Sequence, residues 1–323
     1  MAASPSATTS VATPSPTPIA FRGKVAGCCG TFGFIDSKHL LVFDNPAGQQ
    51  TGAWLVDRAS GSRTFISAGF GLSSASGLVA IPDKSAGTTN IRRLNGSLVF
   101  TIHNGGVLTW ISPDGTHVAW LEDLGITNIS SLVPRTVKLW TAKIDGSDAT
   151  PLLTFDAAAI QWLPDNRHVI ALARAPDGSS AGIWSVNTTD GTNSVVVRGT
   201  FLQALRLSSD GSRMAYLETF SGTSADDGVW VADVDGSRRV HLSESGAFRW
   251  AAGSTQLWFL KLAAAGSGND QLLQVDIATD RVINQVDLGG RVLDDDWEVS
   301  PDGQAVVFWN EKDQSVMLQT ITP

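Results

Sequence analysis

Charged and polar side chains recur in this sequence at one position of a repeated pattern. Arg206 and Arg249 stand 43 residues apart, and Glu298 follows 49 residues after the second arginine. Arginine forks bind carboxylates and phosphates in two-point contacts, while a carboxylate beside them either pairs with them or holds a cation or an amine. The equivalent position is occupied by Trp110 and Gln161 in two earlier repeats. With one further acidic residue, the candidate ligand-binding side chains are Arg206, Arg249, Glu298, Gln161, Trp110 and Asp296.

The residues that flank the charged positions predict where these side chains point. Arg206 lies between Leu205 and Leu207, and large apolar side chains likewise flank Arg249 and Glu298. Alternation with a period of two is typical of a strand, so the three charged groups should project the same way from consecutive strands. Buried charges are costly unless they pair. Two hypotheses stay open: an Arg–Glu–Arg ion cluster that joins the strands, or one wall of a ligand site in a central channel.

Asp296 closes a run of three consecutive aspartates, residues 294–296, that enters the same strand as Glu298. Such a run either forms an acidic mouth that attracts a cation or an amine, or is a solvated loop. Both interpretations place negative charge beside the candidate site.

Other residue types that support catalysis do not form a recognisable motif. His39, His117 and His168 each stand three residues after an acidic turn residue, and this shared repeat position predicts a structural role. The sequence contains no G-x-S-x-G nucleophile elbow, and the nearest segment, residues 71–75, lacks the closing glycine. We therefore expect no catalytic residue, no cofactor and no metal ion.

The two cysteines, Cys28 and Cys29, are adjacent and cannot form a long-range disulfide framework. The simplest interpretation is two small buried residues at the start of an inner strand. A vicinal disulfide and a metal site remain alternatives, although no further ligands stand at zinc-like spacing.

An internal repeat supplies the elements that must position the candidate residues. Residues 111–123, 162–174, 207–219 and 299–311 share an apolar lead, an acidic turn and an alternating apolar strand, and residues 34–43, 72–81 and 250–260 are weaker copies. The turn positions are Asp36, Ala75, Asp114, Asp165, Asp210, Gly253 and Asp302. Their spacing of 39 to 51 residues is typical of propeller blades. Pro-Asp-Gly favours a tight turn because Pro fixes φ, Asp bonds its own backbone and Gly accepts positive φ.

A third and a fourth strand follow in most repeats. The third strand carries a tryptophan near its start, and we expect these side chains to fill equivalent spaces between adjacent sheets: Trp54, Trp140, Trp184 and Trp230. Seven repeats of four strands predict an all-β, seven-bladed β-propeller, with six blades as the alternative. The last repeat lacks a fourth strand, and residues 19–25 form an orphan strand that can pair with it and close the ring. Phe21 and Val25 should be buried at that seam.

The S-P-D-G turn, the apolar strand after it and a W-x-x-D-G third strand together resemble the TolB-like and WD-repeat-like propeller repeats. Residues 112–115 and 300–303 match this pattern best, and the resemblance covers about residues 19–320. It implies a propeller, and such repeats occur in periplasmic or secreted binding proteins and beside catalytic domains of the prolyl-peptidase type. TolB itself has six blades behind an α/β domain, for which this chain has no room.

Composition excludes several classes of function. The chain has 323 residues and a formal net charge of −8, which argues against a nucleic-acid partner. No apolar run reaches the roughly 18 residues of a transmembrane helix. Residues 1–18 are rich in Ala, Ser, Thr and Pro and predict a disordered tether, which leaves residues 19–323 for the propeller. Tethers of this kind follow the anchors of exported proteins, so we expect an extracytoplasmic chain whose export signal or anchor lies outside this sequence. The alternative is a native disordered tail on a cytosolic protein.

These observations predict a monomeric, non-catalytic interaction module that binds a protein, a peptide or a glycan. The alternative is a hydrolase or lyase with its site at the mouth of the propeller channel. Polar side chains from three or more blades that converge on one pocket would favour the enzyme.

Overall fold

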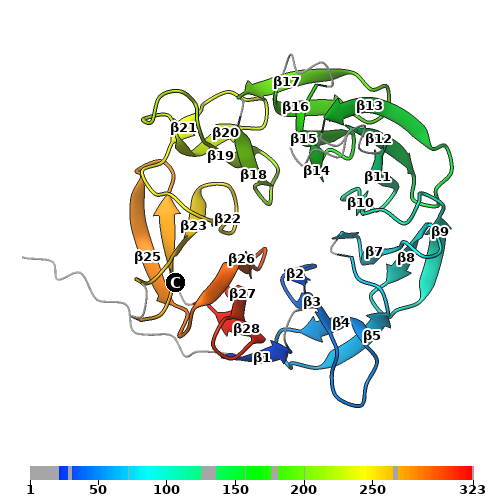
Figure 1. Ribbon diagram of the computed structural model, residues 1–323, viewed down its shortest axis with the longest axis horizontal. Helices are drawn as coiled ribbons and strands as arrows, with labels where there is room; N and C mark the ends of the chain where they lie inside the picture. The colour runs from blue at the N-terminus through cyan, green and yellow to red at the C-terminus, as the bar shows by residue number, and fades with distance from the viewer. Residues whose placement is uncertain are drawn as a thin grey trace, which may run out of the picture.

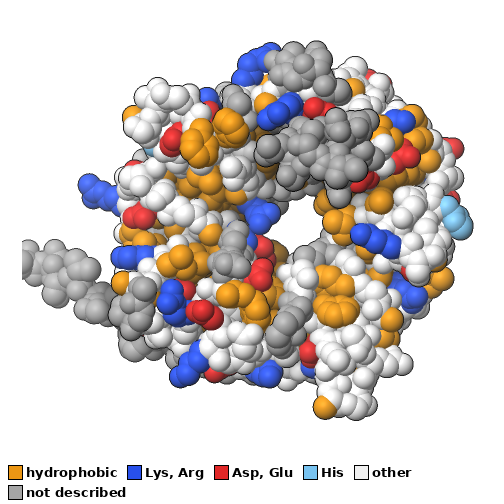
Figure 2. All heavy atoms as spheres, viewed as in Figure 1, with side chains coloured by type: hydrophobic (Ala, Val, Ile, Leu, Met, Phe, Trp, Pro, Cys, Tyr) orange, Lys and Arg blue, Asp and Glu red, His pale blue; other side chains and the backbone are white. Residues whose placement is uncertain are grey.

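Seven four-stranded antiparallel sheets form a ring around a central opening (Figures 1 and 2). This computed structural model describes residues 22–27, 31–71, 73–124, 136–156, 158–175, 181–199, 201–264 and 268–321. The predicted seven-bladed propeller is confirmed, and the six-bladed alternative is wrong. The described residues contain no helix, and hence none long and apolar enough to span a membrane. The tether, Phe21, Cys28 and Cys29 lie outside the described residues.

Each blade runs from an inner strand beside the opening to an outer strand at the rim (Figure 1). Blades 1 to 3 are β2 (Phe32–Phe34), β3 (His39–Asp44), β4 (Gly52–Asp57), β5 (Arg63–Ser67); β6 (Ser74–Ala75), β7 (Leu78–Asp83), β8 (Thr88–Arg93), β9 (Leu98–Ile102); and β10 (Thr109–Ile111), β11 (His117–Asp123), β12 (Thr136–Lys143), β13 (Thr150–Asp156). Blades 4 and 5 are β14 (Ala158–Trp162), β15 (His168–Arg174), β16 (Ala181–Asn187), β17 (Asn193–Arg198); and β18 (Leu202–Leu207), β19 (Arg213–Glu218), β20 (Gly228–Asp233), β21 (Val240–His241). Blades 6 and 7 are β22 (Phe248–Trp250), β23 (Gln256–Lys261), β24 (Gln271–Asp276), β25 (Arg281–Asp287); and β26 (Val292–Val299), β27 (Ala305–Asn310), β28 (Ser315–Thr320) with β1 (Arg22–Ala26).

The N-terminal strand closes the ring, as the sequence predicts. β1 pairs antiparallel with β28 and becomes the outer strand of blade 7 (Figure 1). Val25 is buried in a cluster that also holds Leu40 and Trp54 of blade 1 and Leu318 of blade 7. The strand therefore joins the two ends of the chain both by its backbone ladder and by a shared apolar core.

The tryptophans of the third strands lie between neighbouring blades. Trp54 packs in the cluster shared by blades 7 and 1. Trp184 packs with residues of blades 3 and 4, and Trp230 packs with residues of blades 4 and 5. Trp140 packs in the cluster of blades 2 and 3. This repeated placement confirms that the four tryptophans fill equivalent spaces between sheets.

The serine of the S-P-D-G pattern is a buried hydrogen-bond hub of the first turn. In blade 5, the Ser208 hydroxyl donates to the Asp210 carboxylate over 2.7 Å and accepts from the Arg213 backbone N–H over 3.0 Å. Ser112 and Ser300 make the same two contacts in blades 3 and 7. These bonds satisfy the buried hydroxyl and a backbone N–H of the turn within the protein, which explains why the serine recurs.

Blades 1 and 4 lack this serine, and a histidine takes over part of its role. The Nδ1 atom of His39 lies 2.9 Å from an Asp36 carboxylate oxygen, and that of His168 lies 2.6 Å from Asp165. The structural role predicted for these two histidines is confirmed.

The turn of blade 5 makes a testable contribution to acid stability. The hydrogen bond from the Ser208 hydroxyl holds the pKa of Asp210 far below its ordinary value, with help from Ser212. A carboxyl whose pKa is depressed by folding stabilises the native state above its unfolded pKa of about 4, and that stability is lost as pH falls further. We expect Asp210→Asn to flatten the fall of the urea midpoint below pH 4, whereas Asp313→Asn on an exposed loop should leave it unchanged. A wild-type slope in Asp210→Asn would contradict this role.

The two ends of the ring differ in their connections. Strand polarity places the turns between first and second strands, and between third and fourth strands, on one face, here called the turn face. The loops between second and third strands, and the links from blade to blade, lie on the opposite face, here called the loop face. In the part of the chain that the structure describes, five of the eight exposed large apolar side chains belong to the loop face: Leu108, Leu124, Phe201, Phe220 and Leu262.

Candidate functional site

The inner strands bring the predicted candidates to one level of the channel wall. Each pairs with the second strand of its own blade at an equivalent register: Trp110 with Ala119, Gln161 with Ile170, Arg206 with Ala215, Arg249 with Trp258 and Glu298 with Val307. The repeat alignment therefore predicted the register correctly across five blades.

Arg249 and Glu298 form an ion pair between blades 6 and 7. Arg249 Nε donates to Glu298 Oε2 over 3.1 Å, and Arg249 Nη1 donates to the Phe248 carbonyl over 2.8 Å. The guanidinium also lies over the Trp297 ring, 4.9 Å from its centroid. The Arg249 side chain is 7% exposed, whereas that of Glu298 is 38% exposed. The arginine is thus held inside the blade interface, and the carboxylate faces outward.

Figure 2 shows basic and acidic side chains next to one another at the edge of the opening, on the side of β18, β22 and β26. Asp296 is exposed on this wall, while the side chains of residues 294 and 295 are outside the description. The wall is therefore charged on the side of blades 5 to 7. The equivalent residues of blades 1 and 2 are Phe32 and Gly71, and a Cβ at Gly71 would collide with the Ala80 carbonyl oxygen.

Gln161 also joins two blades. Its Nε2 atom donates to the Leu205 carbonyl over 2.7 Å, and its Oε1 atom accepts from the Leu207 N–H over 3.1 Å. The amide thereby imitates one rung of a β-ladder between β14 and β18. This arrangement favours a structural role for Gln161.

Gln161 bonds to the blade that follows it, whereas two tryptophans bond to the blade that precedes theirs. Trp162 Nε1 donates to the Trp110 carbonyl over 3.1 Å, and Trp250 Nε1 donates to the Arg206 carbonyl over 3.0 Å. Both indoles stand one residue after the candidate position of their own repeat. Sequence reasoning missed this role, although the shared repeat position of the two tryptophans was a signal that could have revealed it.

Two inner strands on the charged side depart from regular pairing. In blade 5 the ladder shifts between Gln203 and Arg206, and Ala204 has a φ of 52°. In blade 7 it shifts between Val292 and Trp297, the segment that contains Asp296. Bulges of this kind re-aim side chains and are frequent beside functional sites. Among the described inner strands, only these two shift against their second strands, so the irregularity coincides with the charged wall.

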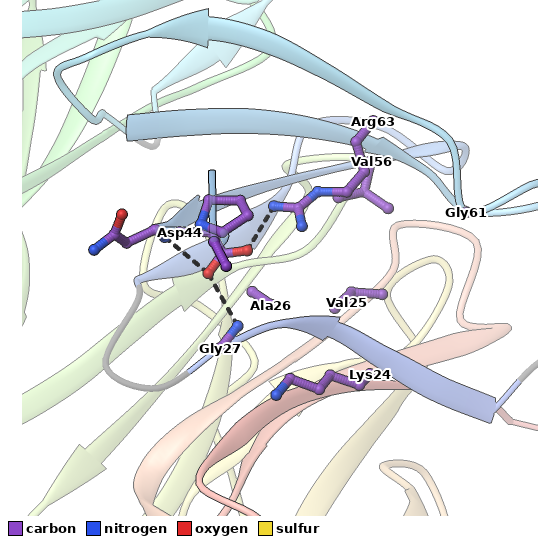
Figure 3. Close-up of a pocket in the computed structure, with 11 residues that line it drawn as sticks. Lys24, Val25, Ala26, Gly27, Asp44, Val56, Gly61 and Arg63 are labelled. Carbon is purple, nitrogen blue, oxygen red and sulfur yellow. Dashed lines mark hydrogen bonds and ion pairs between the residues drawn. The ribbon is translucent and has the colours of Figure 1, made fainter. Parts of the chain in front are cut away.

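A separate polar cluster lies at the closure seam (Figure 3). The buried Asp44 carboxylate accepts from the Gly27 N–H over 3.0 Å, from the Asn45 N–H over 2.9 Å and from Arg63 Nη2 over 2.7 Å. Figure 3 shows Gly27 and Arg63 directed at this carboxylate from opposite sides of a pocket of about 480 Å³. The sequence analysis did not identify this cluster. A signal was present, because Asp44 stands at the repeat position that Glu218 holds in blade 5, where Arg239 forms the equivalent ion pair.

Among the described residues, no three His, Cys, Asp or Glu side chains gather in a way that could hold a metal ion. The described histidines nearest the turns bond to turn residues instead.

Comparison with known proteins identifies the fold. No family model matches the sequence, and no curated protein matches it. The structure is similar to an oligogalacturonate lyase in complex with manganese, at 14% identity and a TM-score of 0.64, over 88% of this chain and 85% of that chain. It is similar to the Cps50 (Swd1) β-propeller domain of Myceliophteria thermophila, at 8% identity and a TM-score of 0.58, over 95% of this chain and 100% of that domain. TolB from Acinetobacter baumannii also matches, at 13% identity and a TM-score of 0.47, over 90% of this chain and 79% of that chain.

The first two likenesses show a β-propeller fold and carry no information on ligand or activity. They confirm the propeller part of the resemblance predicted from the S-P-D-G repeats.

Proposed function

We propose that this chain is a non-catalytic, extracytoplasmic interaction module that binds a protein, a peptide or a glycan. The observation that supports this role best is the pair of bulged inner strands, which interrupt the blade 5 and blade 7 ladders beside Arg206 and Asp296. Regular inner strands would serve a purely structural ring equally well. Both bulges lie on the charged side of the channel, where a ligand with complementary charge would bind.

The ion-pair and ligand-site hypotheses overlap at Glu298, which pairs with Arg249 and is 38% exposed. Arg249 and Gln161 are committed to contacts between blades, so they support the wall. Arg206, Asp296 and the outward-facing Glu298 are the residues proposed to contact a ligand, with Trp110 on the neighbouring side of the ring. The enzyme alternative gains no support, because likeness to a lyase at 14% identity concerns the fold alone.

The proposed channel site can be tested with defined probes. We expect a random peptide library displayed on phage, or a printed glycan array, to yield binders that Arg206→Ala weakens by about tenfold or more. Arg93→Ala removes the same charge from an exposed position on the turn face and is the matched control. Both variants should keep the β-type circular dichroism of the wild type. Binders that are unaffected by Arg206→Ala, Asp296→Asn and Glu298→Gln would contradict the channel site.

A further inference from the structure

The loop face of blade 5 exposes a rigid pair of phenylalanines. Phe201 precedes β18 and Phe220 follows β19, and their exposed fractions are 46% and 77%. The two rings contact edge to face, with centroids 5.6 Å apart. Hydrophobic side chains gather over this blade in the upper left of Figure 2. Exposed apolar side chains that occur singly are ordinary, whereas an exposed aromatic pair marks an interaction surface.

The backbone holds this pair in place. The Thr219 N–H donates to the Phe201 carbonyl over 3.1 Å, which ties the two phenylalanine segments together. Phe220 has a φ of 54°, a conformation that is rare for a bulky residue. Beyond it, the Ser221 N–H donates to Asp227 over 2.8 Å, and Trp230 Nε1 donates to the Asp226 carbonyl over 2.9 Å. A loop that is fixed by these three hydrogen bonds and presents a phenylalanine in an unfavourable backbone conformation is pre-organised to bind.

Further apolar groups lie on the loop face of the neighbouring blades 4 and 6. Leu202, next to Phe201, lines a pocket of about 340 Å³ together with Leu172 and Ala173 of blade 4. On the other side, Leu262 follows β23 on the same face and is 60% exposed. The surface can therefore accept more than one large apolar side chain of a partner. We name Phe201, Phe220, Leu262 and the Leu202 pocket the apolar corner.

The charges beside the apolar corner define the partner further. In the described loop residues 201, 219–227, 242–247 and 262–264, the ionisable side chains are Asp226, Asp227 and Glu244, all acidic. The nearest basic residues are Arg198 and Lys261, at the ends of strands, and Arg174, which lines the Leu202 pocket together with Asp156. A second copy of this chain would bring like charges together, because the chain carries a net charge of −8. The edge-to-face rings also offer no flat platform for a sugar.

We infer that the apolar corner binds a segment of a partner protein in which large apolar side chains stand next to Lys or Arg. The apolar side chains would pack on Phe201, Phe220 and the Leu202 pocket, and the basic group would face Asp226. Buried aromatic anchors with a charged rim are the usual arrangement of strong protein contacts. This inference rests on the proposed binding role and narrows it to one partner class at one corner of the ring.

The test uses the same random peptide library on the full chain, on three new variants and on Arg206→Ala from the channel test. We expect selected peptides to combine an aromatic residue, Leu or Ile with Lys or Arg. Their affinity should fall at least tenfold in the double variant Phe201→Ser, Phe220→Ser and about threefold in Asp226→Asn. Ile283→Ser removes a side chain of similar exposure from β25, away from the loop face, and should leave binding unchanged. Raising the salt concentration should weaken wild-type binding more than Asp226→Asn binding.

Several outcomes would overturn the inference. Peptides without basic residues, or peptides that bind the double phenylalanine variant as well as the wild type, would contradict it. Peptides that lose binding only in Arg206→Ala would support the channel site and contradict binding at the apolar corner. A concentration-dependent dimer that the phenylalanine changes abolish would make a second copy the occupant, and binders found only on a glycan array would make it a sugar. Absence of any peptide or glycan binder would remove both the inference and the proposed function.

Discussion

Replacing Arg249 by alanine is expected to lower the free energy of unfolding by about 2 to 3 kcal/mol, because a buried ion pair that loses one partner costs about 3 to 5 kcal/mol and solvent reaches Glu298 here. The substitution removes the bond to Glu298, the bond to the Phe248 carbonyl and the stacking on Trp297 together. It also leaves a cavity between blades 6 and 7. Urea unfolding followed by tryptophan fluorescence measures this loss.

Two controls separate the ion pair from the rest of the side chain. Arg93→Ala, at an exposed end of β8, should change the free energy of unfolding by less than about 0.5 kcal/mol. Glu298→Gln keeps an acceptor for Arg249 and should cost about 1 kcal/mol, since the carboxylate is 38% exposed. If Arg249→Ala unfolds at the same urea concentration as Arg93→Ala, the guanidinium does not tie the blades together. The difference between the two variants therefore measures what the buried arginine contributes to the ring.

The Arg249 pair also shows how far sequence reasoning extends in a repeat protein. Repeat spacing fixed which residues share a register, because each blade repeats the same ladder and one alignment applies to all of them. Repeat spacing did not show which of the charged residues form structural contacts between blades and which face the channel. That outcome depends on the neighbouring blade, since Arg249 meets Glu298 and Trp297 across an interface that the local pattern does not describe.

The sequence analysis also did not predict where the strands depart from regular pairing. The alternation of Leu205, Arg206 and Leu207 predicts a regular strand, yet the ladder shifts just before it at Ala204. Residues 238–243 have the composition of a strand, but only Val240 and His241 pair with β20. Arg238 enters this segment with a φ of 48°, which ends the ladder on that side. A bulge adds a residue and shifts the phase of the alternation, as between the buried Leu202 and Leu205. Over so few residues, such a shift resembles the irregular end of a strand, so the sequence alone does not reveal it.

The closure strand was predictable by counting, while the contacts that hold it were not. Six blades contain four consecutive strands and the seventh contains three, so one strand from the other end of the chain had to complete it. Asp44 and Arg63, at the end of β3 and the start of β5, have equivalents in Glu218 and Arg239 of blade 5, but the repeat does not show that Asp44 alone of these also contacts β1. Their importance follows from geometry alone, because the Asp44 carboxylate receives β1 at Gly27 and Arg63 at once.

Introducing Val25→Asp is expected to detach β1 and open the ring. Val25 is 6% exposed within the core shared by blades 7 and 1, so an aspartate there would bury an unpaired charge at a cost of several kcal/mol. The loss of stability cannot exceed the free energy with which β1 is held, because the strand can leave while the other strands stay paired. Detachment frees the edge of β28, and an unpaired edge strand promotes aggregation.

Hydrogen exchange and limited trypsin digestion distinguish detachment from global unfolding. In Val25→Asp, the amides of β28 should lose protection and cleavage after Lys24 should accelerate by about tenfold or more, while β15 and β19 stay protected. Lys24→Asp places the same side chain one residue earlier, on the exposed side of β1, and should leave β28 protected. Asp44→Ala removes the contact to Gly27 and leaves Arg63 without its carboxylate, so it should loosen β28 to an intermediate degree. Equal protection of β28 in Val25→Asp and Lys24→Asp would mean that the ring does not depend on this strand for its closure.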